Sequence, residues 1–154
     1  MNEKAIDALN KGETIIEEPF LGDMVKQAVA EGHLVGSTEC PVGSDVYIIS
    51  VPTPINPDKT ADMRFVESAT RTITPCLRPG AIVVLESTSP PRTVTDLMLP
   101  ILKESGLTPG EDLFVAHSPE RILPGKALEE LRTNSRIVGG ITEESAQKVR
   151  DVYK

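Results

Sequence analysis

The chain has 154 residues, with 16 basic and 23 acidic side chains and a formal net charge of −7. This length suits one domain with a single core and is too short for two sizeable ones. An acidic chain in which no stretch combines Lys and Arg with aromatic residues repels a phosphate backbone, so we expect no nucleic-acid partner.

Cys40 and Cys76 form no CxxC pair and have no histidine at ligand spacing, so we expect no metal site. Two lone cysteines in a chain without a signal peptide fit a reducing cytoplasm. No apolar run approaches the roughly 20 residues that a membrane-spanning helix needs. We therefore expect a soluble, cytoplasmic protein without a membrane partner.

The first 40 residues predict two helices and a short strand. Asn2 is placed to cap a helix over residues 3–9. Apolar residues at helical spacing predict a second helix that opens near Pro19 and ends at Gly32. Residues 33–36 indicate a short strand.

Three continuous apolar runs, at residues 45–51, 81–86 and 114–117, predict strands that are buried on both faces. Helical patterns separate and follow them. We expect helices near residues 63–77, from Thr93 or Thr95 (as cap) to residue 102, near residues 126–131, and after a capping Thr142, with a last strand over residues 136–140. Alternating strands and helices are typical of right-handed parallel crossovers, so the expected fold is α/β: a Rossmann-like, mostly parallel sheet flanked by helices.

Polar side chains follow all three strands. Thr53 is held between two prolines, Ser87 and Thr88 follow the second strand, and Glu120 follows the third. Ligands of open α/β sheets bind outside the carboxyl ends of the strands, so these residues point to a site. Two simpler explanations stay open, namely that Ser and Thr favour turns and that Glu120 and Arg121 form a surface ion pair.

The glycine-rich GxGxxG turn of a dinucleotide-binding sheet is not in this sequence, and the adjacent Gly139 and Gly140 do not form it. We therefore expect a sheet that lacks the first two strands and this turn. The strand at residues 45–51 then has an unpaired edge, which is a template for association with another chain. This predicts a homo-oligomer.

Six short motifs together resemble the UDP-glucose/GDP-mannose dehydrogenase family, NAD-dependent enzymes that oxidise a nucleotide-sugar alcohol to a uronic acid. They are Ala8-Leu9-Asn10-Lys11-Gly12, Glu18-Pro19, Val51-Pro52-Thr53-Pro54, Glu86-Ser87-Thr88, Ser118-Pro119-Glu120-Arg121 and Arg136-Ile137-Val138-Gly139-Gly140. The run from Ser118 to Gly125 is most similar to the branch that acts on UDP-N-acetylhexosamines. Pro124 stands where the UDP-glucose branch has a second acid, so that acid's role is not carried over.

The resemblance implies NAD as cofactor and assigns roles to the polar strand exits. Thr88 and Glu120 would be catalytic, with Thr88 helping to hold a water and Glu120 assisting proton movement or water attack. The cofactor-binding residues would be Val51, Pro52, Thr53, Ser87, Thr88 and Glu120. The residues bordering the sugar would be Arg121, Ile122 and Leu123.

The resemblance also implies that the chain is a partial N-terminal NAD-binding domain, without the central helix and the C-terminal UDP-binding domain. The family's cysteine nucleophile, lysine and asparagine would lie in those segments, and neither Cys40 nor Cys76 has the neighbours of that nucleophile. We therefore expect part of an NAD-dependent UDP-N-acetylhexosamine dehydrogenase for surface glycan synthesis, inactive alone.

Two alternatives remain. One is a non-catalytic nucleotide-binding or assembly module derived from the same fold. The other is a relative of the 2-hydroxyacid-type dehydrogenases, against which the Val51–Pro54 and Ser118–Arg121 motifs argue.

Overall fold

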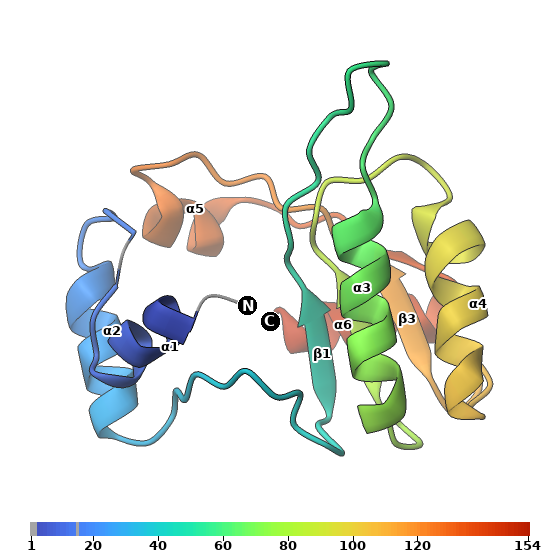
Figure 1. Cartoon of the computed structure of the whole chain (residues 1–154), viewed down its shortest axis with the longest axis horizontal. Helices are drawn as coiled ribbons and strands as arrows, with labels where there is room; N and C mark the ends of the chain where they lie inside the picture. The colour runs from blue at the N-terminus through green and yellow to red at the C-terminus, as the bar shows by residue number, and fades with distance from the viewer. Residues whose placement is uncertain (1–2, 15) are drawn as a thin grey trace. The chain divides into compact units, whose positions relative to one another are not determined.

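The computed structural model describes residues 3–14 and 16–154, which form two compact units (Figure 1). One unit comprises residues 1–40 and 121–135, and the other comprises residues 41–120 and 136–154. The expected helix cap at Asn2 lies outside the described residues. Within the described part of the chain, no helix has the length and apolar character needed to cross a membrane.

The larger unit is built on a four-stranded sheet of order β1-β2-β3-β4. Its strands are β1 (Val46–Ile49), β2 (Ile82–Leu85), β3 (Phe114–His117) and β4 (Gly139–Gly140). The first three strands run parallel, and β4 is antiparallel to β3. The predicted Rossmann-like, mostly parallel sheet is confirmed.

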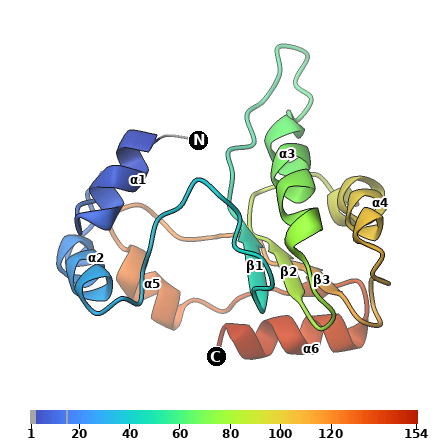
Figure 2. The same cartoon turned by 60° about the horizontal axis from the view of Figure 1, so that its bottom comes forward.

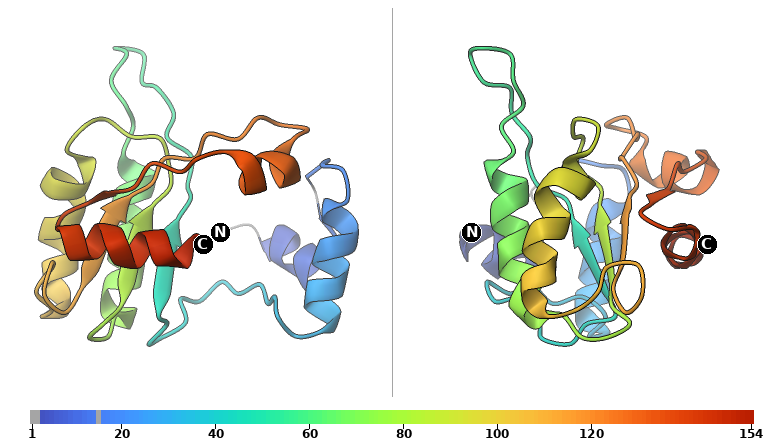
Figure 3. Two further views of the ribbon diagram at one scale, coloured as in Figure 1. Left: turned by 180° about the vertical axis from the view of Figure 1, so that it is seen from behind. Right: turned by 90° about the vertical axis from the view of Figure 1, so that its right-hand side faces the viewer.

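Helices cover both faces of this sheet (Figures 2 and 3). One face carries α3 (Arg64–Ile73) with η1 (Thr74–Cys76), and the continuous helical segment η2 (Val94–Met98), α4 (Leu99–Leu102) and η3 (Lys103–Ser105). The other face carries α6 (Glu143–Val152), whose Val149 packs with Val84 and Ala116. Side chains alternate along a strand, so the neighbours of Val84 in β2 face the α3 layer.

The side chains of the central strands are more deeply buried than those of β1. Val83, Val84 and Leu85 of β2 are fully buried, which confirms that this run is covered on both faces. In β1, by contrast, Ile48 is 47% exposed, so the same prediction is wrong there. The reason is position: β1 is at the end of the sheet, where covering helices no longer reach both faces.

The last strand differs from the expected one. Only Gly139 and Gly140 of residues 136–140 pair with β3, and they do so in antiparallel direction, opposite His117 and Ala116. The next residue, Ile141, donates its N–H to the Val115 carbonyl at 3.0 Å, and α6 begins soon afterwards. The chain therefore adds a two-residue antiparallel strand next to β3 and does not form another parallel strand.

Of the predicted side-chain caps at helix starts, the one at α6 is confirmed and the one at η2 is wrong. The Thr142 hydroxyl accepts the Ser145 N–H at 3.1 Å and caps α6 as expected. Neither Thr93 nor Thr95 caps the helix at η2, because their hydroxyls donate to the carbonyl oxygens of Pro90 and Arg92 instead. Those bonds close the preceding turn and leave no side-chain cap at this helix end.

The smaller unit contains α1 (Glu3–Asn10), α2 (Leu21–Ala30) and α5 (Ala127–Thr133). None of its described residues is buried. Glu18 joins its two chain segments, since its carboxylate accepts the Gly125 N–H and, at 3.5 Å, the Ala127 N–H at the start of α5. A side chain distant in sequence thereby satisfies backbone donors at the start of α5.

The predicted strand at residues 33–36 is wrong, although the helix before it ends as expected. Gly32 has φ 74°, and the N–H groups of Gly32 and His33 return to carbonyls in the last turn of α2, as in a Schellman motif. At Gly36 the side chain of Asn10 donates to the carbonyl and accepts the N–H, at 3.0 and 2.7 Å. The Asn10 amide thus takes the place of a strand partner.

Cys40 and Cys76 are not joined by a disulfide bond. Cys76 is buried in η1 and serves as a small core residue, whereas Cys40 is half-buried.

Candidate functional site

The candidate site lies at the carboxyl edge of the parallel strands (Figure 1). Their last residues, Ile49, Leu85 and His117, are in register across the sheet. The chain therefore leaves all three strands at one edge, as the sequence predicted. This brings the segments that carry Thr53, Ser87 with Thr88, and Glu120 to the same edge.

Ser87 ties the first two exits together. Its hydroxyl donates to the Val51 carbonyl at 2.8 Å and accepts the Val51 N–H at 2.7 Å. Only 8% of Ser87 is exposed, so the side chain acts as a buried bracket between the segments after β1 and β2. Both polar groups of the Val51 backbone are satisfied just before the Pro52–Pro54 stretch.

Two further hydrogen bonds join the second exit to the third. The His117 ring nitrogen Nε2 lies 3.3 Å from the Ser87 carbonyl oxygen, to which it donates. The Glu120 N–H donates to the Glu86 carbonyl at 3.1 Å. The three exits are therefore cross-linked by two side chains and one backbone hydrogen bond. A binding site requires a pre-organised edge of this kind.

The predicted site residues differ in exposure. Thr88 and Glu120 are exposed, Thr53 and Val51 are half-buried, and Pro52 is exposed. Accessible hydroxyl and carboxylate groups on a fixed backbone can hold a water and exchange a proton with a ligand. The sugar-bordering candidates Arg121, Ile122 and Leu123 belong to the smaller unit, where Ile122 is half-buried and the other two are exposed.

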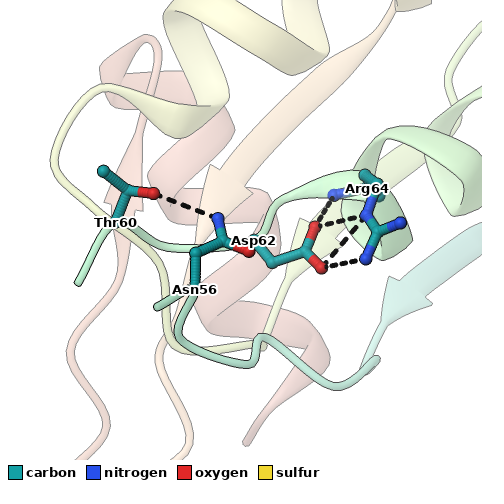
Figure 4. A network of polar contacts seen from close by, with 4 residues as sticks. All are labelled: Asn56, Thr60, Asp62 and Arg64. Atoms are coloured by element: carbon teal, nitrogen blue, oxygen red, sulfur yellow. Dashed lines mark hydrogen bonds and ion pairs between the residues drawn. The ribbon is translucent and has the colours of Figure 1, made fainter. Parts of the chain in front are cut away.

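The segment after Thr53 forms a loop that projects beyond the sheet of its own unit (Figure 1). Its two arms meet in an antiparallel bridge between Ile55 and Ala61. At its base the buried Asp62 carboxylate accepts hydrogen bonds from the Arg64 guanidinium and, second, from the Arg64 backbone N–H, and these bonds lower the pKa of Asp62 (Figure 4). These hydrogen bonds fix the end of the loop that leads into α3.

A pocket of about 330 Å³ opens at the same edge of the sheet. It is lined by residues 89–95, His117 and residues 139–141, and none of the predicted site residues contributes to it. The pocket is mixed in character, with prolines and aliphatic side chains beside Arg92 and His117. Arg92 is already paired with Asp96 through two hydrogen bonds of 2.8 and 2.7 Å, so its charge is largely compensated.

The sequence did not predict a cluster of Glu86, Arg136 and Tyr153. Glu86 Oε1 accepts hydrogen bonds from Arg136 Nη1 at 2.8 Å and from the Tyr153 hydroxyl at 2.7 Å. In the sequence, Glu86 and Arg136 lie within motifs of the family resemblance, and no pattern marks Tyr153. The one available signal was a charged residue at the end of a buried strand.

Tyr153 provides a pH-dependent test of this cluster. Burial first, and then the hydrogen bond to Glu86, raise the pKa of Tyr153 above its ordinary value of 10.0. The unfolded chain then loses this proton at lower pH than the folded chain, so the resulting stability is complete below pH 10 and falls at higher pH. We expect the free energy of urea unfolding to fall more from about pH 9 to about pH 11 in the parent than in Tyr153→Phe. Equal falls would contradict the assignment.

These observations fit one side of a dinucleotide site. At the cross-linked edge the exposed Thr88 and the half-buried Thr53 lie at the carboxyl ends of the strands, where nucleotides bind in such sheets. The glycine-rich turn that cradles a pyrophosphate is not in this sequence. The residues of this edge that could border such a ligand are Val51–Thr53, Ser87 and Thr88.

A mostly parallel sheet with helices on both faces and polar groups at its carboxyl edge defines a Rossmann-like domain of the nucleotide-binding class. The family model for the "UDP-glucose/GDP-mannose dehydrogenase family, NAD binding domain" matches residues 1–154. The chain therefore belongs to the UDP-glucose/GDP-mannose dehydrogenase family.

Named relatives agree with this membership. The UDP-N-acetyl-D-mannosamine dehydrogenase of Salmonella typhimurium is 41% identical over an alignment of 165 residues. The alignment covers 100% of this chain and 38% of the relative. The native structure of UDP-N-acetyl-mannosamine dehydrogenase from Staphylococcus aureus matches with a TM-score of 0.94 and 42% identity, over 99% of this chain and 37% of that one. A ternary complex of GDP-mannose dehydrogenase from Pseudomonas aeruginosa matches with a TM-score of 0.91 and 27% identity, over the same shares. The chain thus spans less than two fifths of these relatives.

Proposed function

We propose that the chain supplies the NAD-binding part of a dehydrogenase that oxidises the primary alcohol of a UDP-N-acetylhexosamine, of the UDP-N-acetyl-D-mannosamine type, to a uronic acid. The observation that carries the proposal is the carboxyl edge, where Ser87 and His117 join the exits of three parallel strands. The activities after which the matched relatives are named supply the substrate class.

The proposal gives each accessible group a task. Bound along Val51, Pro52 and Thr53 and beside Ser87 and Thr88, NAD would accept the hydride from the alcohol carbon. Glu120 takes up the hydroxyl proton or activates a water, and the Thr88 hydroxyl holds that water in place. The backbone from Arg121 to Leu123 borders the sugar. A carboxylate and a hydroxyl on separate exits can share one water because the exits lie at one edge.

Binding and turnover of the 154-residue chain test this proposal separately. We expect calorimetric titration with NADH to show saturable binding that weakens at least about tenfold in Thr53→Ala. We also expect no NAD reduction with UDP-N-acetyl-D-mannosamine, because the family resemblance places the residues that bind UDP, together with the catalytic lysine and asparagine, outside these 154 residues. The exposed Thr72→Ala, on α3, is the matched control.

The outcomes have distinct meanings. No NADH binding by the parent would overturn the cofactor assignment. Sugar-dependent turnover by this chain would overturn the prediction that it is inactive alone. Tight binding of both NADH and a UDP-sugar without turnover, insensitive to Glu120→Gln, would favour the alternative of a non-catalytic nucleotide-binding module.

We further propose a cytoplasmic location and self-association through the outer edge of β1. Among the residues that the structure describes, no strand pairs with that edge, and Ile48 is 47% exposed there. An unpaired edge strand with an exposed apolar side chain is a template for pairing with another chain. Light scattering should show a mass that rises with concentration in the parent and not in Ile48→Lys. A monomeric parent at high concentration would contradict this proposal.

A further inference from the structure

We propose that Glu86, Arg136 and Tyr153 form a positioning cluster that fixes the backbone from which Glu120 and Ser87 leave the sheet. The inference rests on the roles proposed above for those two residues. Its three members come from the end of β2, the segment before β4 and the end of α6. They therefore connect the candidate site to elements on the opposite side of the sheet from α3.

Each member of the cluster touches the other two. Glu86 Oε1 accepts from Arg136 Nη1 at 2.8 Å and from the Tyr153 hydroxyl at 2.7 Å. The Arg136 guanidinium carbon lies 4.1 Å from the centroid of the Tyr153 ring. A charge-assisted hydrogen bond and a cation–π contact both depend on geometry, so the triangle restricts the Glu86 side chain to one position.

The backbone of Glu86 links that position to the candidate site. Its N–H donates to the Ile49 carbonyl at 2.9 Å, and its carbonyl accepts the Glu120 N–H at 3.1 Å. Ser87, which brackets Val51, is the next residue. Fixing the Glu86 side chain therefore fixes the peptide units that meet β1, Ser87 and Glu120, and displacements of about 1 Å matter greatly in a catalytic site.

Stability alone does not account for the choice of residues. The Glu86 and Arg136 side chains are only 15% and 24% exposed, so both are largely removed from water. A desolvated ion pair is often no more stabilising than apolar residues of similar size. The ion pair and its directed hydrogen bonds add a defined geometry. Such a geometry matters at Glu86, because its backbone meets β1, Ser87 and Glu120.

Amide hydrogen exchange of the 154-residue chain, followed by NMR, tests this role. The variant is Arg136→Met, which removes the charge and keeps much of the side-chain volume. We expect the Glu120 amide to exchange at least about tenfold faster relative to the core amides of Val84 and Val115. Arg136→Lys should restore part of the protection, because the charge returns without the planar guanidinium.

Two further variants keep the result interpretable. Tyr153→Phe removes one hydroxyl and should accelerate Glu120 exchange by a smaller factor, even if Arg136→Met folds poorly. Arg150→Met removes an exposed arginine of α6 that pairs with Asp151, and it should leave Glu120 exchange unchanged.

A purely structural cluster gives a different pattern. If Glu120 and the core amides accelerate equally in Arg136→Met and Tyr153→Phe, or if Glu120 keeps its protection, the positioning role is overturned. Exchange needs no ligand, so this result is separate from the proposed function. A parent chain that fails to bind NADH overturns the cofactor assignment while the exchange rates still decide the positioning role.

Discussion

Replacing Gly140 by alanine is expected to lower the free energy of unfolding by about 1–3 kcal/mol, at the upper end of that range. A Cβ at position 140 would lie 2.5 Å from the Thr142 carbonyl oxygen and closer still to the Ala146 nitrogen. Both atoms belong to the first hydrogen bond of α6, an N–H···O contact of 3.1 Å. Backbone atoms cannot rotate away as a flexible side chain can, so α6 must shift from the sheet. Urea unfolding followed by circular dichroism measures the loss.

The adjacent Gly139 is the matched control. Its nearest neighbour for an added Cβ is the His117 carbonyl oxygen at 3.9 Å, an ordinary contact, and its φ is not positive. Gly139→Ala should therefore leave stability unchanged or raise it by up to about 1 kcal/mol, because alanine restricts the unfolded chain. Equal effects of the two substitutions would show that the close approach of α6 does not explain Gly140.

The same two glycines explain why β4 could not be predicted correctly. Apolar runs such as the one around Val83 identify a buried strand because many side chains share one environment. A two-residue glycine strand carries no side chains, so its sequence indicates neither its length nor its direction. Both are tertiary features: Gly139 and Gly140 pair with β3 in antiparallel direction, and Gly140 lies against the start of α6.

Hydrogen bonds from polar side chains account for the other errors. Residues 33–36 resemble a strand, yet the Asn10 side chain satisfies the Gly36 backbone, 26 residues away in sequence. Thr93 is a good cap by residue type, but its hydroxyl donates to Pro90. The prediction for Thr142 is confirmed because its hydroxyl accepts the N–H of Ser145, three residues further along the chain. Prediction from sequence failed where the partner was distant, as for Gly36, and where residue type did not show which neighbouring group the hydroxyl bonds, as for Thr93.

The same limits apply to the prediction of the candidate site. Strand direction alone predicts that Thr53, Ser87, Thr88 and Glu120 leave the sheet at one edge, and the structure confirms it. The groups that hold this edge could not be predicted, because Arg136 and Tyr153 lie 50 and 67 residues from Glu86. The chemical roles of the exposed residues remain predictions.

Replacing Ser87 by alanine is expected to cost about 1–3 kcal/mol and to loosen the edge where NAD is proposed to bind. The hydroxyl forms two bonds of 2.7 and 2.8 Å with the N–H and the carbonyl of Val51. Alanine would leave both groups without this partner in a half-buried segment, and the cost of an unsatisfied buried group exceeds the net worth of the bond. Urea unfolding gives the stability change, and the exchange rate of the Val51 amide shows where it arises.

Thr88 provides the control for Ser87, since it is the next residue and is exposed. Thr88→Ala should change stability by less than about 0.5 kcal/mol and leave Val51 exchange unaltered. Comparison of Ser87→Ala with Thr88→Ala also distinguishes two ways in which NADH binding can weaken. Ser87→Ala should act through the bracket, with faster Val51 exchange, and Thr88→Ala only through a lost contact. If Ser87→Ala is as stable as the parent and Val51 keeps its protection, the exits are held by the backbone alone, and Ser87 is not the bracket of this edge.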